Sequence, residues 1–581
     1  MLYRITCRGS FRIILRRFKV WGSEQHPIAI AFATRVFEDI TTFRIENMTQ
    51  MKGRVQSTRR VFPATPPKNT TSTKLSVVDA TVARFAPCGA IWFFDGAQDL
   101  GATDPALFQR IEAALSQTLD DYPHYSGHLR WATSGDVVPG DANTRFTGRP
   151  IAVYGTSDDP GVELIIVQDE RELASVVPSL DERATTKRVW IASDFPQADF
   201  LPGTTLAFSN LAEYVGLPGV AVQLTAFKCG AYAVGMKLTH CLSDAICLLQ
   251  FVHRWAAHTR QLFGADTSTP PGSDALAKPV FDPARLDEYA RLSASATELD
   301  EARISNARSL PLHRFDWWAT EAPGYPSWAT ASSDATKPPP EDLQKVTLSP
   351  STHPPWPTWN LAATVEHVQV RFSAGEVGRM KSAAQETSPV QGQIVSRQDA
   401  LLAHVWTLIN RARLLQGSDA PVYLDITLGL RNRLSPPLPD HFVGSPILLA
   451  HVAQTGSTAA TAKIGAIASS IRATMSHFTP QAVSDYLYDA AHEVSPQRLW
   501  QGFLGTQHTL VTSWARARAY EVDFRGTQQL ARYVQGLMPK LDGLVQIMDL
   551  ADTGDFDVSI ALEKEAMHRF LSDPLLRSFD N

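Results

Sequence analysis

Two apolar runs separated by a short turn constrain the fold of this chain most strongly. Residues 220–227 and 231–238 are each long enough for a buried strand, and the Lys-Cys-Gly between them carries the glycine that a tight hairpin turn favours. Directly after them, residues 245–258 repeat apolar side chains every three or four positions, which predicts an amphipathic helix. The chain is therefore expected to mix strands with helices.

The same alternation continues along the chain. Capping-box patterns at residues 373–376 and 396–399 each indicate the start of a helix. Further strands are expected at residues 91–94, 151–154, 162–167 and 368–372. Further helices are expected at residues 107–119 and 400–415. The sequence thus predicts an α/β protein with mixed sheets flanked by helices.

Length and proline content indicate more than one domain. At 581 residues the chain is too long for one ordinary domain. Between residues 267 and 361 the apolar periodicity is lost and prolines gather, which favours a crossover between domains. We therefore predict a first domain at residues 71–266, the Pro-rich crossover at 267–361, and a second domain of similar size at 362–581.

Residues 1–70 form a basic extension. It begins with several arginines, and no acidic residue occurs before Glu24. Two interpretations stay open: a mitochondrial targeting segment in residues 1–20, or a spurious upstream extension with the true start near Met48 or Met51. Residues 63–73, rich in proline and threonine, are typical of a disordered lead-in. We favour the second interpretation and hence a cytoplasmic location.

Composition narrows the classes of function. The net charge of −5 is spread without a long block of one sign, which argues against nucleic acid as a partner. No stretch approaches the roughly 20 consecutive apolar residues of a membrane span. The five cysteines are scattered without metal-ligand spacing, which favours a reducing compartment and indicates neither a disulfide framework nor a metal site. A monomer with a small-molecule partner is expected.

The strongest candidate for chemistry lies between the predicted hairpin and the helix that follows it. His240 and Asp244 form an H-x-x-x-D unit there, and either Ser243 or Asp244 is placed to cap the helix. A histidine of near-neutral pKa can take a proton from a hydroxyl group. Because about one such spacing is expected by chance, the unit alone fits a packed structural histidine equally well.

An ordered series of companion motifs runs from residue 74 to the C-terminus. It comprises Leu75, Ser76 and Asp79; residues 222–225 with Phe227, Cys229 and Gly230; His240 and Asp244; Ser396, Asp399 and Trp406; residues 431–439 with Gly444; residues 512–514; Asp523 and Phe524; and Asp542 and Gly543. With this series the chain resembles the BAHD-type acyltransferases, especially their fungal secondary-metabolite branch of trichothecene acetyltransferase-like proteins. The resemblance implies two chloramphenicol-acetyltransferase-like domains around a central channel.

The resemblance also implies roles for single residues. His240 matches the general base of the family. Asp244 matches an aspartate that turns away from the substrate and pairs with an arginine, here Arg431 or Arg433, so that it orients the site and carries no proton. Trp514 matches a tryptophan whose indole N–H faces the tetrahedral intermediate.

The hydroxyl groups of Thr512 and Ser513 are further candidates for contacts with substrate. Acyl-CoA is implied as a co-substrate, with no bound cofactor and no metal. The expected reaction is acyl transfer from acyl-CoA to a hydroxyl or amine of a small molecule. A non-catalytic binding or scaffold protein that retains the fold is the alternative.

Several positions depart from the family pattern. Asp523 opens a structural element that usually continues Phe-Gly-Trp-Gly, but Arg525 and Thr527 replace its two glycines, which puts the local turn in doubt. Ala245 and Ser445 stand where glycine and asparagine are common. None of these departures removes the proposed base or its orienting aspartate.

Other catalytic readings of the sequence are weaker. A serine hydrolase of the α/β type would need a G-x-S-x-G elbow, and the chain has none. His240 and Asp244 could bind zinc together with His253 or His258, but the spacing is more simply that of one helix face.

Overall fold

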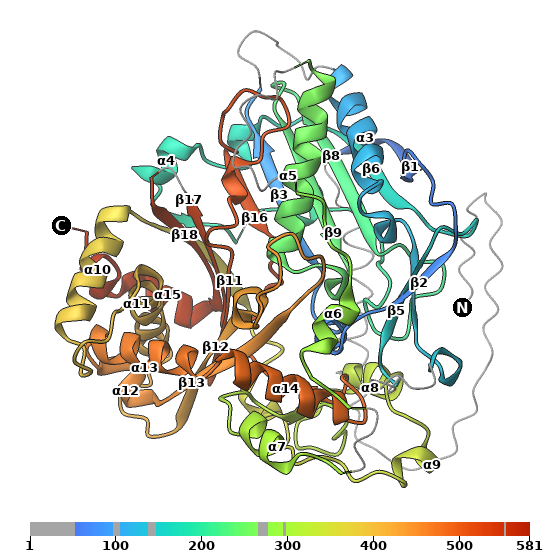
Figure 1. Ribbon diagram of the computed structural model, residues 1–581. Coiled ribbons are helices and arrows are strands. Elements are labelled where there is room, and N and C mark those ends of the chain that lie inside the picture. Colours follow the sequence, from blue (N-terminus) through green and yellow to red (C-terminus); the bar gives the residue numbers. More distant parts are fainter. Residues whose placement is uncertain are drawn as a thin grey trace, which may run out of the picture. The chain divides into compact units, whose positions relative to one another are not determined.

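Two mixed β-sheets form the centre of the structure (Figure 1). The computed structural model describes residues 53–96, 105–137, 147–193, 195–264, 277–293, 298–550 and 553–580. The six-stranded sheet has the order β1 (Arg54–Val61), β6 (Val162–Asp169), β8 (Val220–Phe227), β9 (Tyr232–Leu238), β3 (Cys88–Phe94) and β16 (Tyr533–Gly536). The seven-stranded sheet has the order β13 (Ile447–Thr455), β12 (Pro421–Gly429), β15 (His508–Ser513), β17 (Leu544–Leu550), β18 (Asp555–Glu563), β11 (Val365–Phe372) and β7 (Val189–Ile191).

Both sheets combine parallel and antiparallel neighbours. In the first, β6 and β8 are parallel and the other pairs are antiparallel. In the second, β15 is parallel to both β12 and β17, and the other pairs are antiparallel. This confirms the predicted fold class, a mixed α/β protein.

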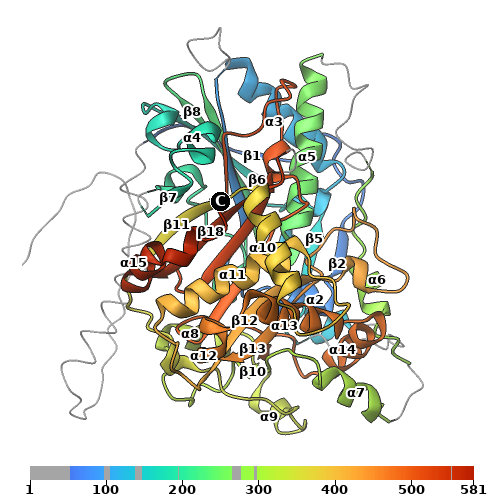
Figure 2. The ribbon, with the colours of Figure 1, turned by 90° about the vertical axis from the view of Figure 1, so that its left-hand side faces the viewer.

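Helices cover one face of each sheet and bury its apolar side chains (Figures 1 and 2). On the first sheet, α3 (Pro105–Leu119) and α5 (Ala245–Leu262) pack against β3, β8 and β9, with Trp92 and Trp255 fully buried between the layers. The second core is formed with α10 (Ala374–Glu386), α11 (Arg397–Ala412), α13 (Ile464–Ser476) and α15 (Lys564–Ser572). No helix in the described ranges has the length and apolar character that a membrane crossing requires.

The two sheets exchange one strand each. β16 comes from the C-terminal part of the chain and pairs with β3 in the first sheet. β7 comes from the N-terminal part and pairs with β11 in the second. A buried ion pair between Arg183 and Asp557, 2.7 Å apart, joins the same two parts. The relative position of the sheets is therefore held by backbone pairing as well as by side chains.

The hairpin and helix predicted around His240 are confirmed. β8 and β9 are antiparallel, and Gly230 in their turn has a φ of 79°, a conformation that glycine adopts without steric cost. Asp244, and not Ser243, caps α5, because its carboxylate accepts the N–H of Cys247 at 2.9 Å. The two predicted capping boxes also form, with Ser373 and Ser396 as the caps.

The interpretation of residues 63–73 as a disordered lead-in is wrong for residues 71–73, which belong to a strand, and the basic extension before them also contains a strand. β1 pairs with β6 at the edge of the first sheet, and β2 (Thr71–Lys74) pairs with β5 (Pro150–Tyr154). Most side chains of β1 are exposed, so it has no apolar alternation and forms by backbone hydrogen bonding. The interpretations of residues 1–52 concern positions outside the described ranges.

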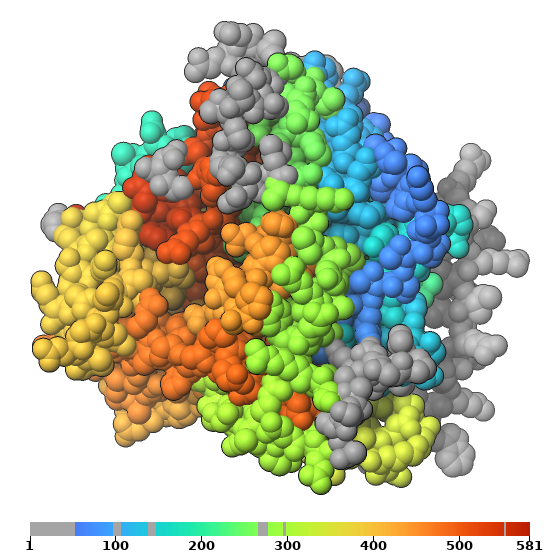
Figure 3. All heavy atoms as spheres, viewed as in Figure 1, coloured from blue at the N-terminus to red at the C-terminus, as the bar shows by residue number. Residues whose placement is uncertain are grey.

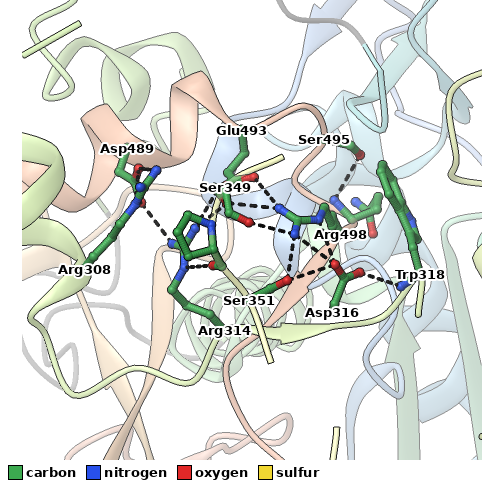
Figure 4. Close-up of polar contacts among 12 residues, drawn as sticks. Arg308, Arg314, Asp316, Trp318, Ser349, Ser351, Asp489, Glu493, Ser495 and Arg498 are labelled. Carbon is green, nitrogen blue, oxygen red and sulfur yellow. Dashed lines mark hydrogen bonds and ion pairs between the residues drawn. The ribbon is translucent and has the colours of Figure 1, made fainter. Parts of the chain in front are cut away.

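The predicted crossover contains short elements that bind to the second half of the chain. Figure 3 shows its surface in green shades between the blue and orange parts. Arg498 holds it through a hydrogen bond to Asp316 at 3.0 Å and one to the Ser349 carbonyl at 2.9 Å (Figure 4). The elements are α6 (Pro283–Glu288), α7 (Glu301–Arg308), β10 (Phe315–Asp316), α8 (Ser327–Asp334) and α9 (Pro340–Leu343).

The remaining described elements are small or peripheral. They are α2 (Val77–Thr81), β4 (His128–Trp131), α4 (Leu180–Ala184), α12 (Gly456–Thr461), α14 (Pro480–His492) and β14 (Leu499–Trp500). Of these, two matter for function: Trp500 of β14 lines the cavity described below, and α2 carries Asp79, which contacts Ser445 beside His240.

Candidate active site

A cavity of about 390 Å³ is lined by residues of both sheets. Cys88 and Gly89 of β3 come from the first sheet, and Thr427 of β12 and Leu449 of β13 come from the second. The cavity wall includes six of the residues predicted from sequence: His240, Asp244, Arg431, Thr512, Ser513 and Trp514. Segments separated by more than 250 positions thus meet at one site.

His240 lies where the first sheet meets its helix. β9 ends at Leu238, His240 begins a short turn, and α5 starts at Ala245. The imidazole is half-buried and its ring lies edge-on to Phe85, with 5.4 Å between the ring centres. Burial lowers its pKa below the ordinary value, although its own carbonyl and Asp244 oppose the shift. The ring is therefore neutral near pH 7, as a general base must be.

Ser445 defines which ring nitrogen of His240 is free. Its hydroxyl donates to the His240 carbonyl oxygen at 2.5 Å, and its Oγ lies 3.4 Å from His240 Nδ1. Because the single hydroxyl proton is used on the carbonyl, we assign the imidazole proton to Nδ1, which donates to Oγ. The lone pair on Nε2 then remains available to take a proton.

Asp79 holds Ser445 in place through a hydrogen bond, a role that the sequence did not reveal. Its Oδ1 accepts the Ser445 N–H at 2.6 Å, and its Oδ2 accepts the Ser76 hydroxyl at 2.6 Å. Burial raises the pKa of this carboxyl to about 6, although three hydrogen bonds oppose the shift. Gly444 is required beside it, because a Cβ there would lie 2.9 Å from Asp79 Oδ1 and its φ is 146°.

Asp244 is paired with Arg431 in a buried, two-pronged contact. Arg431 Nη1 lies 2.5 Å from Asp244 Oδ2, and Nη2 lies 3.1 Å from Oδ1. Asp244 also donates its backbone N–H to the Gly444 carbonyl at 3.1 Å. Arg433 does not take part, since it donates to backbone carbonyls at the end of α13 and beyond. With all these contacts made, Asp244 positions the turn that carries His240.

Trp514 follows β15 at the cavity wall. It is 4% exposed, and among the described residues its indole N–H has no hydrogen-bond acceptor. Thr512 and Ser513 precede it and are both partly exposed to the cavity. An unpaired N–H donor beside two hydroxyl groups can stabilise, by hydrogen bonding, an oxygen atom that becomes negatively charged during a reaction.

The loop that begins at Asp523 folds without the two usual glycines. The Asp523 carboxylate accepts the N–H groups of Arg525, Gly526 and Gln528, each at 2.9 Å. Positive φ values fall on Gly526 and Gln528, so neither Arg525 nor Thr527 needs a left-handed conformation. Asp523 and this loop lie outside the cavity lining, in a structural position.

The two histidines considered as zinc ligands are engaged elsewhere. His253 Nε2 lies 3.1 Å from the Arg518 carbonyl, and His258 Nδ1 lies 3.0 Å from the Thr118 hydroxyl. Neither lines the cavity that His240 borders. The described residues do not bring these histidines together with His240 and Asp244 as a metal-binding group.

A second buried polar group lies behind the cavity wall and was not predicted. Asp425 Oδ2 is 2.8 Å from His508 Nδ1, and Oδ1 is 3.2 Å from His313 Nε2. Burial would raise the pKa of Asp425, but the two imidazoles hold it at about 2. These residues have the ligand types of a metal site. The 2.8 Å contact is a hydrogen bond that joins β15 to β12, and the His313 contact is an ion pair that connects the crossover to β12.

Two mixed sheets with a shared cavity and a neutral histidine at its wall define the class of a two-domain acyltransferase. The Transferase family model matches residues 194–312 and 319–576, which is more than half of the chain. The chain therefore belongs to the Transferase family, that is, the BAHD acyltransferases. It is an acyltransferase of the fungal branch that the motifs indicated.

Relatives of the chain are named acyltransferases. Acyltransferase AFT15-1 of Alternaria alternata is 27% identical over 493 residues, covering 82% of this chain and 88% of the relative. Acyltransferase abl6 of Leptosphaeria maculans is 25% identical over 456 residues, covering 78% and 82%. These similarities extend over most of both chains.

Solved structures share the fold at low sequence identity. TRI101 of F. graminearum in complex with coenzyme A and T-2 mycotoxin has a TM-score of 0.60 at 14% identity, covering 87% of this chain and 98% of that one. Vinorine synthase has a TM-score of 0.54 at 17% identity, covering 89% and 96%.

Proposed function

We propose that the chain transfers an acyl group from acyl-CoA to a hydroxyl or amine of a small molecule, with His240 as the general base. One observation carries this proposal: the same cavity is lined by His240, whose neutral imidazole has a free Nε2, and by Trp514, whose indole N–H is unpaired among the described residues. The complex of TRI101 with coenzyme A and T-2 mycotoxin supports a thioester donor and a small acceptor. A secondary metabolite is the proposed acceptor class.

The proposed reaction proceeds in two steps without an acyl-enzyme. His240 Nε2 takes the proton of the acceptor group while its oxygen or nitrogen attacks the thioester carbonyl carbon. The negative charge on the carbonyl oxygen is stabilised by the Trp514 N–H and the hydroxyl of Thr512 or Ser513. The carbon–sulfur bond then breaks, and the imidazolium returns the proton to the thiolate of coenzyme A.

Trp514→Phe removes the indole donor and keeps an aromatic ring. We expect kcat to fall about 10²–10³-fold, the typical effect of losing one oxyanion donor. The Michaelis constant should change little, since the charge that the donor stabilises develops only in the transition state. Trp190→Phe is the matched control, because Trp190 lies on β7 outside the cavity. Equal rates for both variants would remove Trp514 from the mechanism.

The pH dependence follows from the lowered pKa of His240. Only the neutral imidazole is active, so kcat/KM should rise with pH through this pKa and stay flat above it. Because burial lowers the pKa of His240, the decline should begin below the ordinary value of about 6.5. Initial rates between about pH 5 and 9 measure this profile. An inflection above the ordinary value would contradict the assignment.

The alternative is a binding or scaffold protein that retains the fold. Release of free thiol from acetyl-CoA, with a panel of hydroxylated and aminated small molecules, separates the two functions. An enzyme releases thiol in proportion to acylated product, and a scaffold releases none. The intact His240, Asp244 and Trp514 favour the enzyme.

A further inference from the structure

The cavity wall carries one unbalanced positive charge. Among the described lining residues, the charged side chains are Arg84, Asp244 and Arg431, and the latter two neutralise each other. The other lining residues are mostly apolar or aromatic, including Trp317, Trp359 and Trp500. A cation in such surroundings lowers its free energy by binding an anion.

Among the described residues, no carboxylate forms an ion pair with Arg84, although the charge of Asp316 acts on it. Its Nη2 donates to the Gln497 carbonyl, its guanidinium lies 4.6 Å from the centre of the Trp317 ring, and Nη1 has no acceptor. Burial lowers the pKa of Arg84 to about 9, so the side chain stays charged near neutral pH. By contrast, the buried Arg149, Arg183 and Arg498 all pair with a carboxylate.

Asp316 and Glu493 are both already bound to arginines other than Arg84 (Figure 4). Asp316 Oδ2 accepts from Arg498 at 3.0 Å, and its Oδ1 accepts the Trp318 N–H at 3.0 Å. Glu493 accepts from Arg314 at 2.7 Å and from Arg498 at 3.3 Å. If either carboxylate turned to Arg84, it would lose its present hydrogen bonds. The counter-ion of Arg84 is therefore expected to come from outside the protein.

We propose that Arg84 binds a carboxylate of the substrate, so that the enzyme acts on an acid with an apolar, planar body. This inference rests on the proposed acyl transfer and adds the class of substrate. The indoles of Trp317 and Trp500 meet edge to face at 85°, with 5.1 Å between the ring centres, and both line the cavity with apolar aromatic surface that a planar ring can pack against. Arg84 directly precedes Phe85, which touches the His240 ring. An acid held there presents a more distant hydroxyl or amine to Nε2.

The test compares acids with their methyl esters, which keep the shape and lose the charge. Suitable probes are 6-hydroxy-2-naphthoate, 4-hydroxycinnamate and a medium-chain hydroxy acid, each paired with its ester. Binding is measured by calorimetry on His240→Ala protein, so that the result does not depend on turnover. At least one acid should bind about tenfold or more tightly than its ester, the effect expected for a charged hydrogen bond.

Variants of Arg84 assign the preference to this side chain. Arg84→Gln should abolish the difference between acid and ester, whereas Arg84→Lys, which keeps the charge, should retain part of it. Arg525→Gln is the matched control, because Arg525 also stacks on an aromatic ring, that of Tyr232, but outside the cavity. A preference for no acid, or one that persists in Arg84→Gln, would overturn the proposal.

Two further arms identify where the carboxylate resides. If malonyl-CoA outperforms acetyl-CoA in the wild type and loses this advantage in Arg84→Gln, the carboxylate belongs to the acyl group, and carboxylate binding by Arg84 is supported. If Arg84→Gln weakens binding of free coenzyme A and leaves the acids unaffected, the side chain serves a phosphate, and the proposal fails. Binding of acids without any thiol release would refute the acyl transfer alone.

Discussion

Replacing His240 by alanine is expected to lower the rate of acyl transfer about 10²–10⁴-fold, the usual contribution of a general base. The imidazole has its Nδ1 turned to Ser445, which leaves only Nε2 for the acceptor. No other histidine lines the cavity in the described ranges. Thiol release from acyl-CoA at saturating acceptor gives kcat directly.

The control for this variant is His568→Ala, which removes an exposed imidazole on α15. It should leave the rate unchanged. Binding of coenzyme A to His240→Ala should also be unchanged, because the proposed role of His240 is proton transfer during the reaction and not binding of the donor. A rate equal to that of the wild type would remove His240 from the mechanism and leave the binding or scaffold function.

Local patterns in the sequence were sufficient to predict the elements around His240. An apolar hairpin and a helix with a capping residue depend on neighbours within a few positions, and these appear directly in the sequence. The edge strand β1 could not be predicted in this way, because its exposed side chains leave no apolar period. The exchange of β7 and β16 between the sheets was missed for another reason: strand pairing over such distances has no local signature.

The same distinction applies to the site. His240 and Asp244 are neighbours on one turn and were found together. Arg431 was one of two candidates, and only the fold separates it from Arg433, which faces backbone carbonyls. The support of Ser445 by Asp79 spans 366 positions, so no spacing could indicate it. For Arg84 the informative feature is a missing partner, which requires a structure. The domain boundaries at residues 266 and 361 stay a prediction.

Arg431→Met is expected to destabilise the protein by about 3–5 kcal/mol, because it leaves the Asp244 carboxylate buried without a counter-charge. Asp244 is 4% exposed and Arg431 is 6% exposed. The pair joins residues 187 positions apart and fixes the turn that carries His240, so activity should fall together with stability. Denaturant unfolding followed by fluorescence measures the change in midpoint and slope.

A double variant separates the buried charge from lost packing. Adding Asp244→Asn to Arg431→Met removes the charge, while the amide oxygen can still accept the Cys247 N–H that caps α5. Much of the lost stability should therefore return. Arg433→Met is the matched control. It should destabilise the protein less, because it removes hydrogen bonds to two carbonyls and leaves no carboxylate without a counter-charge. If Arg431→Met were no more harmful than Arg433→Met, the ion pair would have no special part in holding the catalytic turn.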